Sequence, residues 1–295
     1  TKNEIANMKD RQVVLLENIR FHKDEKGNKG ELGEWLAHLG DIFVQDCFGV
    51  AHRADASIVG IPPYLPSYAG FLLEKEIKGL DKVLKTPKRP FVSVVGGAKI
   101  ETKIPVLKNL LKSTDYILMG GGLVNTYLHA KGYGVGDSLV DKDFQKQALQ
   151  YCTNRKVIKP VDVVVGNMKG TEYRIVKLQK TKFQVCKKGE MILDMGPETV
   201  QLFAEYIRKA KTIVWNGAMG YFEQEPYNIA TMAVGGVIAE RSQKRGVFGV
   251  VGGGETVQVM KILKAEEKID LVSTGGGAML EYLAGNKLPG IEVLK

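Results

Sequence analysis

The sequence predicts an α/β protein in which parallel sheets carry helices on both faces. Short apolar runs alternate with longer amphipathic segments, which is the pattern of repeated strand–helix units. Parallel strands that are buried on both faces are apolar throughout, and these runs have that character. Glycine accounts for 34 of 295 residues and gathers at the ends of the runs instead of being spread along the chain.

Four units share the order apolar run, glycine turn and helical pattern. They are Phe91–Val95 with Gly96-Gly97, Tyr116–Met119 with Gly120–Gly122, Val247–Val251 with Gly252–Gly254, and Leu271-Val272 with Gly275–Gly277. A helix that opens on glycine offers free backbone N–H groups and the positive end of its dipole to a phosphate. The alternative is that glycine only makes each turn tight. Four such turns on one sheet favour phosphate binding.

The remaining elements are predicted from shorter patterns. We expect further strands at Val13–Leu16, Ile42–Val44, Val161–Val165 and Thr212–Trp215. A helix begins at Pro197, because proline suits the first helical position and apolar residues then follow on one face. The alternation from Glu172 to Cys186 predicts a small hairpin. A helical stretch from about Tyr68 to Leu84, flanked by prolines, predicts a helix between two domains.

The composition is that of an ordinary globular protein, with 44% hydrophobic residues and a net charge of +9. The sequence shows no apolar stretch long enough to span a bilayer and no signal-peptide pattern, so we expect neither membrane insertion nor secretion. Three cysteines that stand far apart, outside any metal-ligand spacing, favour a reducing cytoplasm. The positive charge suggests anionic partners, but no basic stripe with interleaved aromatics predicts nucleic-acid binding.

Charged residues beside the glycine turns are candidates for the site. Neither a P-loop nor a dinucleotide-binding glycine motif is present. Lys99 and Lys103 fall on one face at a helix start, where they could clamp a polyphosphate or remain solvated. Glu223, in a glycine-rich loop after a strand, could accept ribose hydroxyls or could simply be exposed. Glu255 could approach a phosphate-bound Mg²⁺, because hard cations prefer carboxylate oxygen, or could be favoured by the helix dipole alone.

Two arginines near the start of the chain are candidates for holding an anion. Arg20 and Arg53 each follow a predicted strand, and a guanidinium can grip phosphate or carboxylate with two parallel hydrogen bonds. His52 could join them, although a lone histidine beside a strand end is more often structural.

Eight segments taken together resemble one family, the phosphoglycerate kinases. They read LLENIRFH (15–22), VQDCFGVAHR (44–53), RPFVSVVGGAKIETKI (89–104), ILMGGGLVNTYL (117–128), LDMGPETVQLF (193–203), TIVWNGAMGYFE (212–223), VVGGGET (250–256) and VSTGGGAMLEYL (272–283). They occur in the order of the family and cover essentially the whole chain. Any one segment alone is a weak signal, whereas the set is highly specific.

The resemblance implies phosphoryl transfer between 1,3-bisphosphoglycerate and MgADP, giving 3-phosphoglycerate and MgATP in glycolysis and gluconeogenesis. It implies two doubly wound, Rossmann-like domains, with Mg²⁺ as cofactor and closure about a hinge that excludes water. The expected division is 1–67 for the phosphoglycerate-binding domain, 68–87 for the hinge helix, 88–280 for the nucleotide-binding domain and 281–295 for a returning tail. A cytoplasmic monomer is expected, with no nucleic-acid or membrane partner.

Site residues follow from the resemblance position by position. Nucleotide-binding positions are Gly97, Ala98, Lys99, Lys103, Gly121, Gly122, Leu139, Asn216, Ala218, Glu223, Gly252, Gly253, Gly254, Glu255 and Thr256. Within this set the resemblance gives Lys99 and Lys103 to the phosphates, Gly121 and Gly122 to the adenine and Glu223 to the ribose. It implies that Glu255 is the metal-associated acid. Catalytic roles fall to Lys99 and to Gly275, Gly276 and Gly277, and substrate-binding roles to Arg20 and Arg53.

The chain departs from the family pattern in three ways. The family's opening substrate-binding segments, which supply an aspartate, an asparagine, a histidine and an arginine, have no counterpart here, so we expect residues 1–295 alone to be impaired. The family usually has proline where Ala218 stands and aspartate where Glu255 stands. Two alternatives therefore stay open, a nucleotide-binding fragment of the same fold without catalysis and a nucleic-acid binder suggested only by charge.

Overall fold

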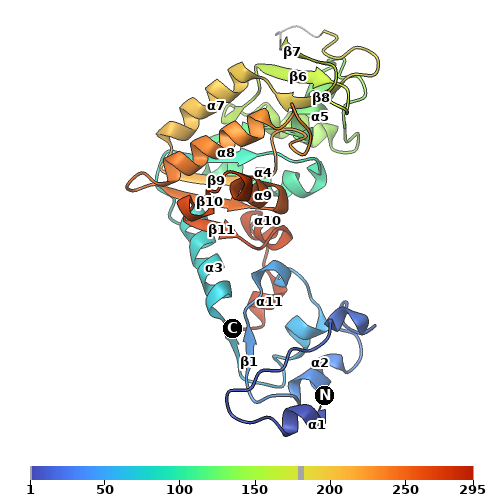
Figure 1. Ribbon diagram of the computed structural model, residues 1–295, viewed down its shortest axis with the longest axis vertical. Helices are drawn as coiled ribbons and strands as arrows, with labels where there is room; N and C mark the ends of the chain where they lie inside the picture. Colours follow the sequence, from blue (N-terminus) through green and yellow to red (C-terminus); the bar gives the residue numbers. More distant parts are fainter. Residues whose placement is uncertain (1, 179–182, 295) are drawn as a thin grey trace. The chain divides into compact units, whose positions relative to one another are not determined.

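The chain forms two compact units in a computed structural model that describes residues 2–178 and 183–294 (Figure 1). The larger unit runs from Lys78 to Gly285. The smaller unit comprises the chain up to Ile77 together with the segment from Asn286 onward. The boundary falls inside helix α3 (Phe71–Leu84), so the first turns of this helix belong to the smaller unit.

The larger unit is built on a sheet of six strands in the order β11-β10-β9-β3-β4-β5, in which every neighbouring pair is parallel. The two central strands, β3 and β9, are buried at every position, as expected for strands covered on both faces. The strands are β3 (Phe91–Val95), β4 (Tyr116–Met119), β5 (Val157–Ile158), β9 (Thr212–Asn216), β10 (Phe248–Gly252) and β11 (Leu271–Ser273). The predicted α/β class with a parallel sheet is confirmed.

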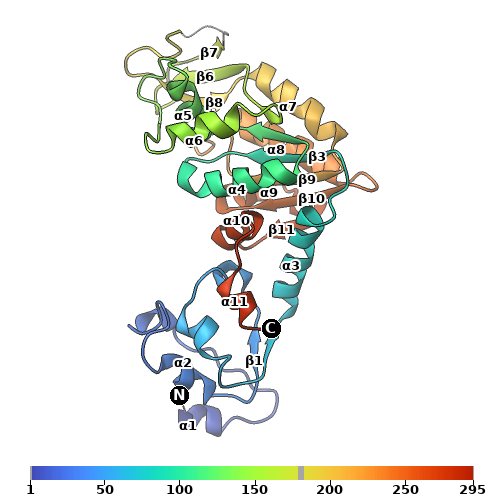
Figure 2. The same ribbon diagram turned by 180° about the vertical axis from the view of Figure 1, so that it is seen from behind.

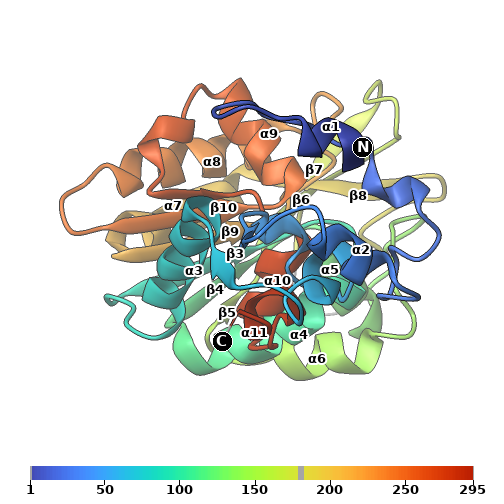
Figure 3. The same cartoon turned by 90° about the horizontal axis from the view of Figure 1, so that it is seen from below.

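Helices cover both faces of this sheet. Figures 2 and 3 show α4 and α6 on one face, where α10 also packs on α4, and α7, α8 and α9 on the other. The helices are α4 (Ile100–Ser113), α5 (Gly122–Ala130), α6 (Gln145–Cys152), α7 (Pro197–Lys209), α8 (Ile229–Ser242), α9 (Gly254–Ile262) and α10 (Gly277–Leu283), with a short 3₁₀ turn, η4, at Glu266–Lys268. The helix predicted to begin at Pro197 does begin there.

The four predicted strand, glycine turn and helix units are present. They are β3 with α4, β4 with α5, β10 with α9 and β11 with α10. Gly121, Gly253 and Gly276 each precede the first helical residue with a positive φ, of 62°, 98° and 43° respectively. Backbone in that region is strained for residues with a Cβ, so the turns require glycine.

A second, antiparallel sheet of three strands in the order β7-β6-β8 belongs to the same unit. Its strands are β6 (Asp162–Gly166), β7 (Tyr173–Lys177) and β8 (Met191–Met195). The hairpin predicted within 172–186 differs in its partner strand, because β7 pairs antiparallel with the preceding strand β6. Part of the predicted hairpin, 179–182, lies outside the described residues.

The smaller unit has a two-stranded parallel sheet of β1 (Phe43–Gln45) and β2 (Ser67–Ala69). Its helical elements are α1 (Lys2–Ala6), η1 (Ile19–Phe21), α2 (Leu32–Ala37), η2 (Phe48–Val50), η3 (Ala56–Gly60) and α11 (Pro289–Glu292). Gly290 of α11 packs so closely on Ala51 that a Cβ there would lie 3.0 Å from the Ala51 Cα. The C-terminal segment therefore belongs to the core of this unit.

Two predictions for the smaller unit are wrong in detail. Val13–Leu16 is irregular and exposed, because no strand pairs with it within the described part of the chain and a single strand leaves its backbone groups without partners. The helix expected from Tyr68 begins at Phe71, because 67–69 form β2 beside β1. Throughout the described residues no helix combines the length and the apolar character needed to cross a membrane.

Candidate active site

The candidate site lies at the carboxyl ends of the parallel strands, where the sheet changes winding direction. From β3 the chain moves through α4 to β4 on one side, whereas from β9 it moves through α8 to β10 on the other. Because β3 and β9 are neighbours, the connections that follow them run to opposite sides of the sheet. Open α/β sheets bind their ligands at this kind of switch point.

Three strand-end loops are held together by their backbones at this point. The N–H of Gly96 donates to the Asn216 carbonyl at 3.0 Å, and that of Gly97 donates to the Ala218 carbonyl at 2.6 Å. Gly121 donates to the carbonyl of Met219 at 2.9 Å. A Cβ on Gly121 would lie 2.6 Å from both the N and the O of Gly97, so the approach depends on glycine. The ends of β3, β4 and β9 therefore form one rigid platform.

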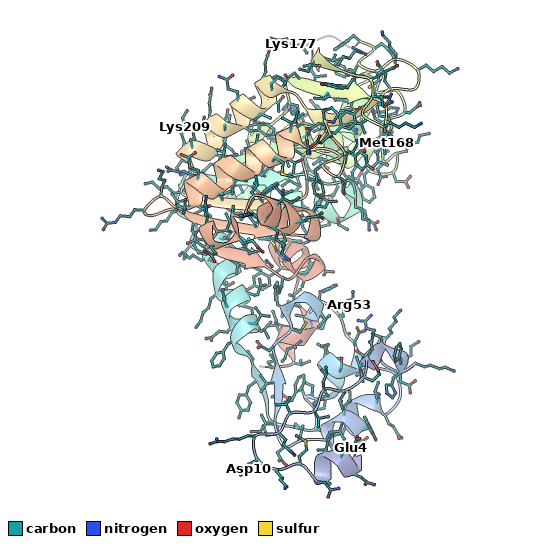
Figure 4. All side chains as sticks on the ribbon, viewed as in Figure 1. Glu4, Asp10, Arg53, Met168, Lys177 and Lys209 are labelled. Carbon is teal, nitrogen blue, oxygen red and sulfur yellow. The ribbon has the colours of Figure 1, made fainter. Side chains whose placement is uncertain are left out.

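A cavity of about 410 Å³ opens beside this platform. Its lining includes the predicted residues Gly97, Ala98, Gly121, Gly122, Leu139, Ala218, Glu223 and Glu255. Glu223 is exposed at its edge, and so is the side chain of Leu139. The lining also includes eleven residues that sequence reasoning missed, among them Asn125, Met168, Met191, Asp194, Met219 and Tyr221. Met168, labelled in Figure 4, is 47% exposed and contributes an apolar side chain. A mostly apolar slot of this size suits a planar base.

A second cavity of about 370 Å³ adjoins the first and has a different character. It is lined by Lys99, Lys103 and Asn216 together with glycines that open helices, Gly253, Gly254 and Gly276. Gly97, Ala98 and Glu255 line both cavities. One ligand can therefore place an apolar group in the first cavity and an anionic group in the second, where cations and helix N-termini converge.

The two lysines differ in environment. Lys99 precedes α4 and is exposed, whereas Lys103 is 7% exposed and donates a hydrogen bond from Nζ to Asn216 Oδ1. Burial lowers the pKa of Lys103 to about 8, against the opposing attraction of the Glu255 carboxylate. The alternative that both lysine side chains are solvated at the surface is therefore wrong for Lys103. Its buried side chain lines the second cavity.

Glu255 stands in the first turn of α9, and its Oε2 accepts a hydrogen bond from the Ala218 N–H at 3.0 Å. The two positions at which the sequence departs from the family pattern thus contact each other. Within the described residues no group of three or more His, Cys, Asp or Glu side chains is placed to hold a metal ion. A single carboxylate beside a cavity lined by lysines and helix N-termini fits Mg²⁺, which is commonly bound by one or two carboxylates together with substrate phosphates.

Asp194 is the least expected member of the site. It is 1% exposed, its Oδ2 accepts from the Ala230 N–H at 2.9 Å, and its Oδ1 has no hydrogen-bond partner among the described residues. Burial raises the pKa of Asp194 to about 8, so the carboxyl is mainly neutral at pH 7. The signal in the sequence is a lone carboxylate inside the apolar strand Met191–Met195.

Two predicted nucleotide-binding residues, Gly252 and Thr256, and two predicted catalytic residues, Gly275 and Gly277, do not line either cavity. Thr256 is fully buried, and its hydroxyl donates to the carbonyls of Gly252 at 2.6 Å and Gly253 at 2.9 Å. Gly275 donates its N–H to Ser273 Oγ at 3.1 Å, next to Gly276, which does line the second cavity. Gly252 and Gly277 complete the turns at the end of β10 and the start of α10. Direct roles for these four residues stay a prediction.

The two arginines belong to the smaller unit. Arg20 forms an ion pair with Asp55, with Nη2 2.7 Å from Oδ2, and its backbone N–H is capped by the Asn18 side chain. Arg53 lies two residues before Asp55 and is exposed (Figure 4). His52 has a buried Nδ1 without a hydrogen-bond partner among the described residues. Substrate binding by these arginines stays a prediction.

Comparisons with known proteins decide the family. The family model described as phosphoglycerate kinase matches residues 1–286. The chain belongs to the phosphoglycerate kinase family.

Similar proteins extend over nearly the whole chain. Curated phosphoglycerate kinases from Chloroflexus aggregans and Clostridium perfringens are 43% and 44% identical, each over 99% of this chain and 73% of the relative. A phosphoglycerate kinase structure from Pyrococcus horikoshii matches with a TM-score of 0.85 and 32% identity, over 99% of this chain and 75% of that one. One from Coxiella burnetii matches with a TM-score of 0.82 and 38% identity, over 94% of this chain and 71% of that one. The chain is therefore a kinase, a phosphotransferase of glycolysis.

Proposed function

We propose that this chain transfers a phosphoryl group between 1,3-bisphosphoglycerate and MgADP, giving 3-phosphoglycerate and MgATP. The observation that carries the proposal is the pair of adjoining cavities at the switch point of the sheet, one apolar and one lined by lysines and helix N-termini. Their shared border at Gly97, Ala98 and Glu255 matches a ligand with an apolar base at one end and a polyphosphate at the other.

The nucleotide would bind with its base in the first cavity and its phosphates in the second. Gly121 and Gly122 would face the adenine, because they lie at the close contact between loops where a Cβ does not fit. Glu223, exposed at the edge of the first cavity, would accept hydrogen bonds from the ribose. Lys99, Lys103 and the turn at Gly275–Gly277 would stabilise the phosphates and the transferring group through positive charge and N–H donors.

The chemistry requires no covalent intermediate with the protein. Phosphoryl transfer passes through a loose transition state, so the protein contributes positioning and charge stabilisation. Glu255 would hold Mg²⁺ through its carboxylate, and the bound cation would neutralise charge on the nucleotide phosphates. Asn216 would keep Lys103 aimed at the phosphates, because its Oδ1 accepts the lysine hydrogen bond.

Acceptor binding is proposed for the smaller unit, where Arg20 and Arg53 would hold the phosphate or carboxylate of phosphoglycerate. Substrates on two units would need closure of one unit toward the other, with α3 as the hinge, since this helix crosses the boundary at Ile77 and Lys78. We further propose a cytoplasmic monomer without nucleic-acid or membrane partners.

Two measurements test the proposal. Calorimetry with MgADP should show binding that weakens by at least about tenfold in Lys103→Met, because a buried charge-assisted contact is lost. Lys209→Met is the matched control, since Lys209 is an exposed lysine in the last turn of α7 (Figure 4). Absence of MgADP binding to the unsubstituted chain would refute the nucleotide assignment.

The second measurement is turnover of 1,3-bisphosphoglycerate and MgADP to ATP by residues 1–295. It separates the kinase from the second candidate, a nucleotide-binding chain without catalysis, which is favoured by the fact that both cavities lie entirely in the larger unit. Turnover supports the kinase, and MgADP binding without any turnover supports the second candidate.

A further inference from the structure

Glu255 occupies the border between the two cavities. Three residues line both of them, Gly97, Ala98 and Glu255, and of these Glu255 alone has a polar side chain. Its carboxylate has two oxygens with different surroundings. Oε2 accepts the Ala218 N–H at 3.0 Å, while no hydrogen bond to a described residue occupies Oε1. One carboxylate oxygen of Glu255 is therefore bonded to a loop of the first cavity, while the side chain also lines the second cavity.

The loop that donates this hydrogen bond is otherwise held by groups of the larger unit's interior. Met219 and Gly220 donate their N–H groups to Thr231 Oγ1 at 3.0 and 3.3 Å, and Tyr221 donates to the Leu193 carbonyl at 2.7 Å. Ala218 is 3% exposed, so its N–H cannot turn to water when Glu255 is removed. A buried N–H that loses its partner is costly, and the local backbone would shift to recover one.

A shift of Ala218 would change the first cavity directly. Ala218, Met219, Gly220, Tyr221 and Glu223 form one side of its lining. The Ala218 carbonyl also accepts the Gly97 N–H at 2.6 Å, so the same displacement would reach the platform under the cavity. A Cβ on Gly97 would lie 3.4 Å from Glu255 Oε2, which shows how closely the carboxylate is packed against this turn.

We propose that Glu255 is a positioning residue for the base-binding cavity, acting through the Ala218 N–H, in addition to any role at the phosphates. The proposal rests on the proposed function, in which the first cavity takes the base. Its distinctive consequence is that removing a carboxylate at the phosphate end weakens the binding of a ligand that has neither phosphate nor metal.

The experiment measures adenosine binding by NMR titration in the absence of Mg²⁺. Glu255→Met removes the acceptor at similar side-chain length and should weaken adenosine binding about three- to tenfold, because the lost hydrogen bond is charge-assisted. Glu198→Met is the matched control. It removes another carboxylate from the first turn of a helix, α7, where Glu198 is half-exposed and paired with Lys177. Adenosine affinity in this control should equal that of the unsubstituted chain.

Two further variants separate positioning from metal binding. Glu255→Gln keeps an oxygen that can accept the Ala218 N–H, so it should restore most of the adenosine affinity while MgADP binding remains impaired. Ala218→Pro removes the N–H itself, since proline has no amide hydrogen. In the Ala218→Pro background, Glu255→Met should cause no further loss of adenosine affinity, because the two changes remove the same contact.

Hydrogen exchange provides a readout that does not depend on a ligand. The Ala218 amide should be protected in the unsubstituted chain and should exchange at least about tenfold faster in Glu255→Met. The buried Thr114 amide, which donates to the Leu110 carbonyl at 2.8 Å, should stay protected and report that the fold is intact. Adenosine affinity in Glu255→Met within twofold of the unsubstituted value would overturn the inference, as would unchanged exchange at Ala218. Failure of the unsubstituted chain to bind adenosine or MgADP would instead overturn the proposed function.

Discussion

In the larger unit the candidate site is held by contacts between backbone segments, whereas in the smaller unit Arg20 is held by the side chain of Asp55 and Arg53 is exposed. Gly121 rests on Gly97 with no room for a Cβ, and three strand ends share hydrogen bonds. Arg20 forms an ion pair with Asp55, the residue that precedes the short helix η3. The comparison indicates that the candidate site of the larger unit is preformed, because its geometry is set by the same contacts that set the fold.

The two units also differ in how much of their apolar surface is buried. In the smaller unit Val13, Leu15 and Phe71 are 92%, 96% and 89% exposed, and its sheet has only two strands of three residues within the described chain. In the larger unit every residue of β3 and β9 is buried. Because burial of apolar surface is the main favourable contribution to folding, the larger unit should be the more stable of the two.

The largest effect is expected from Gly121→Ala. The residue has φ 62°, and a Cβ would meet the Gly97 backbone at 2.6 Å, where no flexible side chain can move aside. We expect a loss of about 2–5 kcal/mol in the free energy of unfolding, from backbone strain together with overpacking. Urea unfolding of the larger unit measures it.

Gly236→Ala is the control for that change. Gly236 is exposed inside α8, with a helical φ and open space around its Cβ position, so alanine should stabilise by about 0.5–1 kcal/mol. Equal effects of the two substitutions would contradict the view that contact between backbones holds the site.

The next effect is a pH dependence that belongs to the larger unit alone. The pKa of Asp194 is about 8 in the folded chain, against 3.8 as the ordinary value, because burial disfavours the carboxylate. The folded state therefore keeps a proton that the unfolded state releases, so the contribution to stability is complete below about pH 4 and is lost as pH rises to about 8. Asp194→Asn should remove this slope.

Denaturant unfolding at several pH values measures the difference. Between about pH 5 and about pH 9 the unsubstituted larger unit should lose about 2 kcal/mol or more relative to Asp194→Asn, given about 1.4 kcal/mol for each pKa unit. Unfolding of the smaller unit should show no change on this substitution. Parallel pH profiles for the two proteins would show that Asp194 is ionised in the folded chain.

A smaller effect is expected in the protons exchanged on binding. Burial lowers the pKa of Lys103 to about 8, so near pH 8 the ammonium is about half deprotonated in the free protein. Phosphate groups in the second cavity favour the charged form and should draw in roughly half a proton at that pH. Calorimetry in buffers of different ionisation enthalpy should show this uptake for MgADP, and Lys103→Met should abolish it. If Lys103→Met still takes up a proton on binding MgADP, the proton binds to a group other than Lys103.

The smallest effect is expected in the smaller unit, from Asp55→Asn. The Arg20–Asp55 pair has side chains 32% and 10% exposed, so solvent screens part of the attraction. We expect a loss of about 1 kcal/mol or less in unfolding free energy, decreasing with added salt. A loss comparable to that of Gly121→Ala would show that the smaller unit depends on side chains as strongly as the larger depends on its backbone.

Most of the larger unit could be predicted from the sequence because its signals are local. The apolar run Phe91–Val95 and the glycines after it predict a buried strand and a helix-opening turn, and the structure has both. The predictions fail where strand formation depends on a pairing partner from elsewhere in the chain. Val13–Leu16 has the composition of a strand but no neighbouring strand among the described residues, and Tyr173–Lys177 pairs with the strand before it.

The candidate site divides in the same way. The sequence by itself determined the glycine-opened helices, the placement of Lys99 and Lys103 at a helix start and the family. Only the tertiary structure decided that Lys103 is buried while Lys99 is exposed, that Asp194 is a mainly neutral carboxyl, and that Glu255 contacts Ala218. The physical reason is that composition and spacing govern local conformation, whereas burial and hydrogen-bond partners depend on segments brought together from far along the chain.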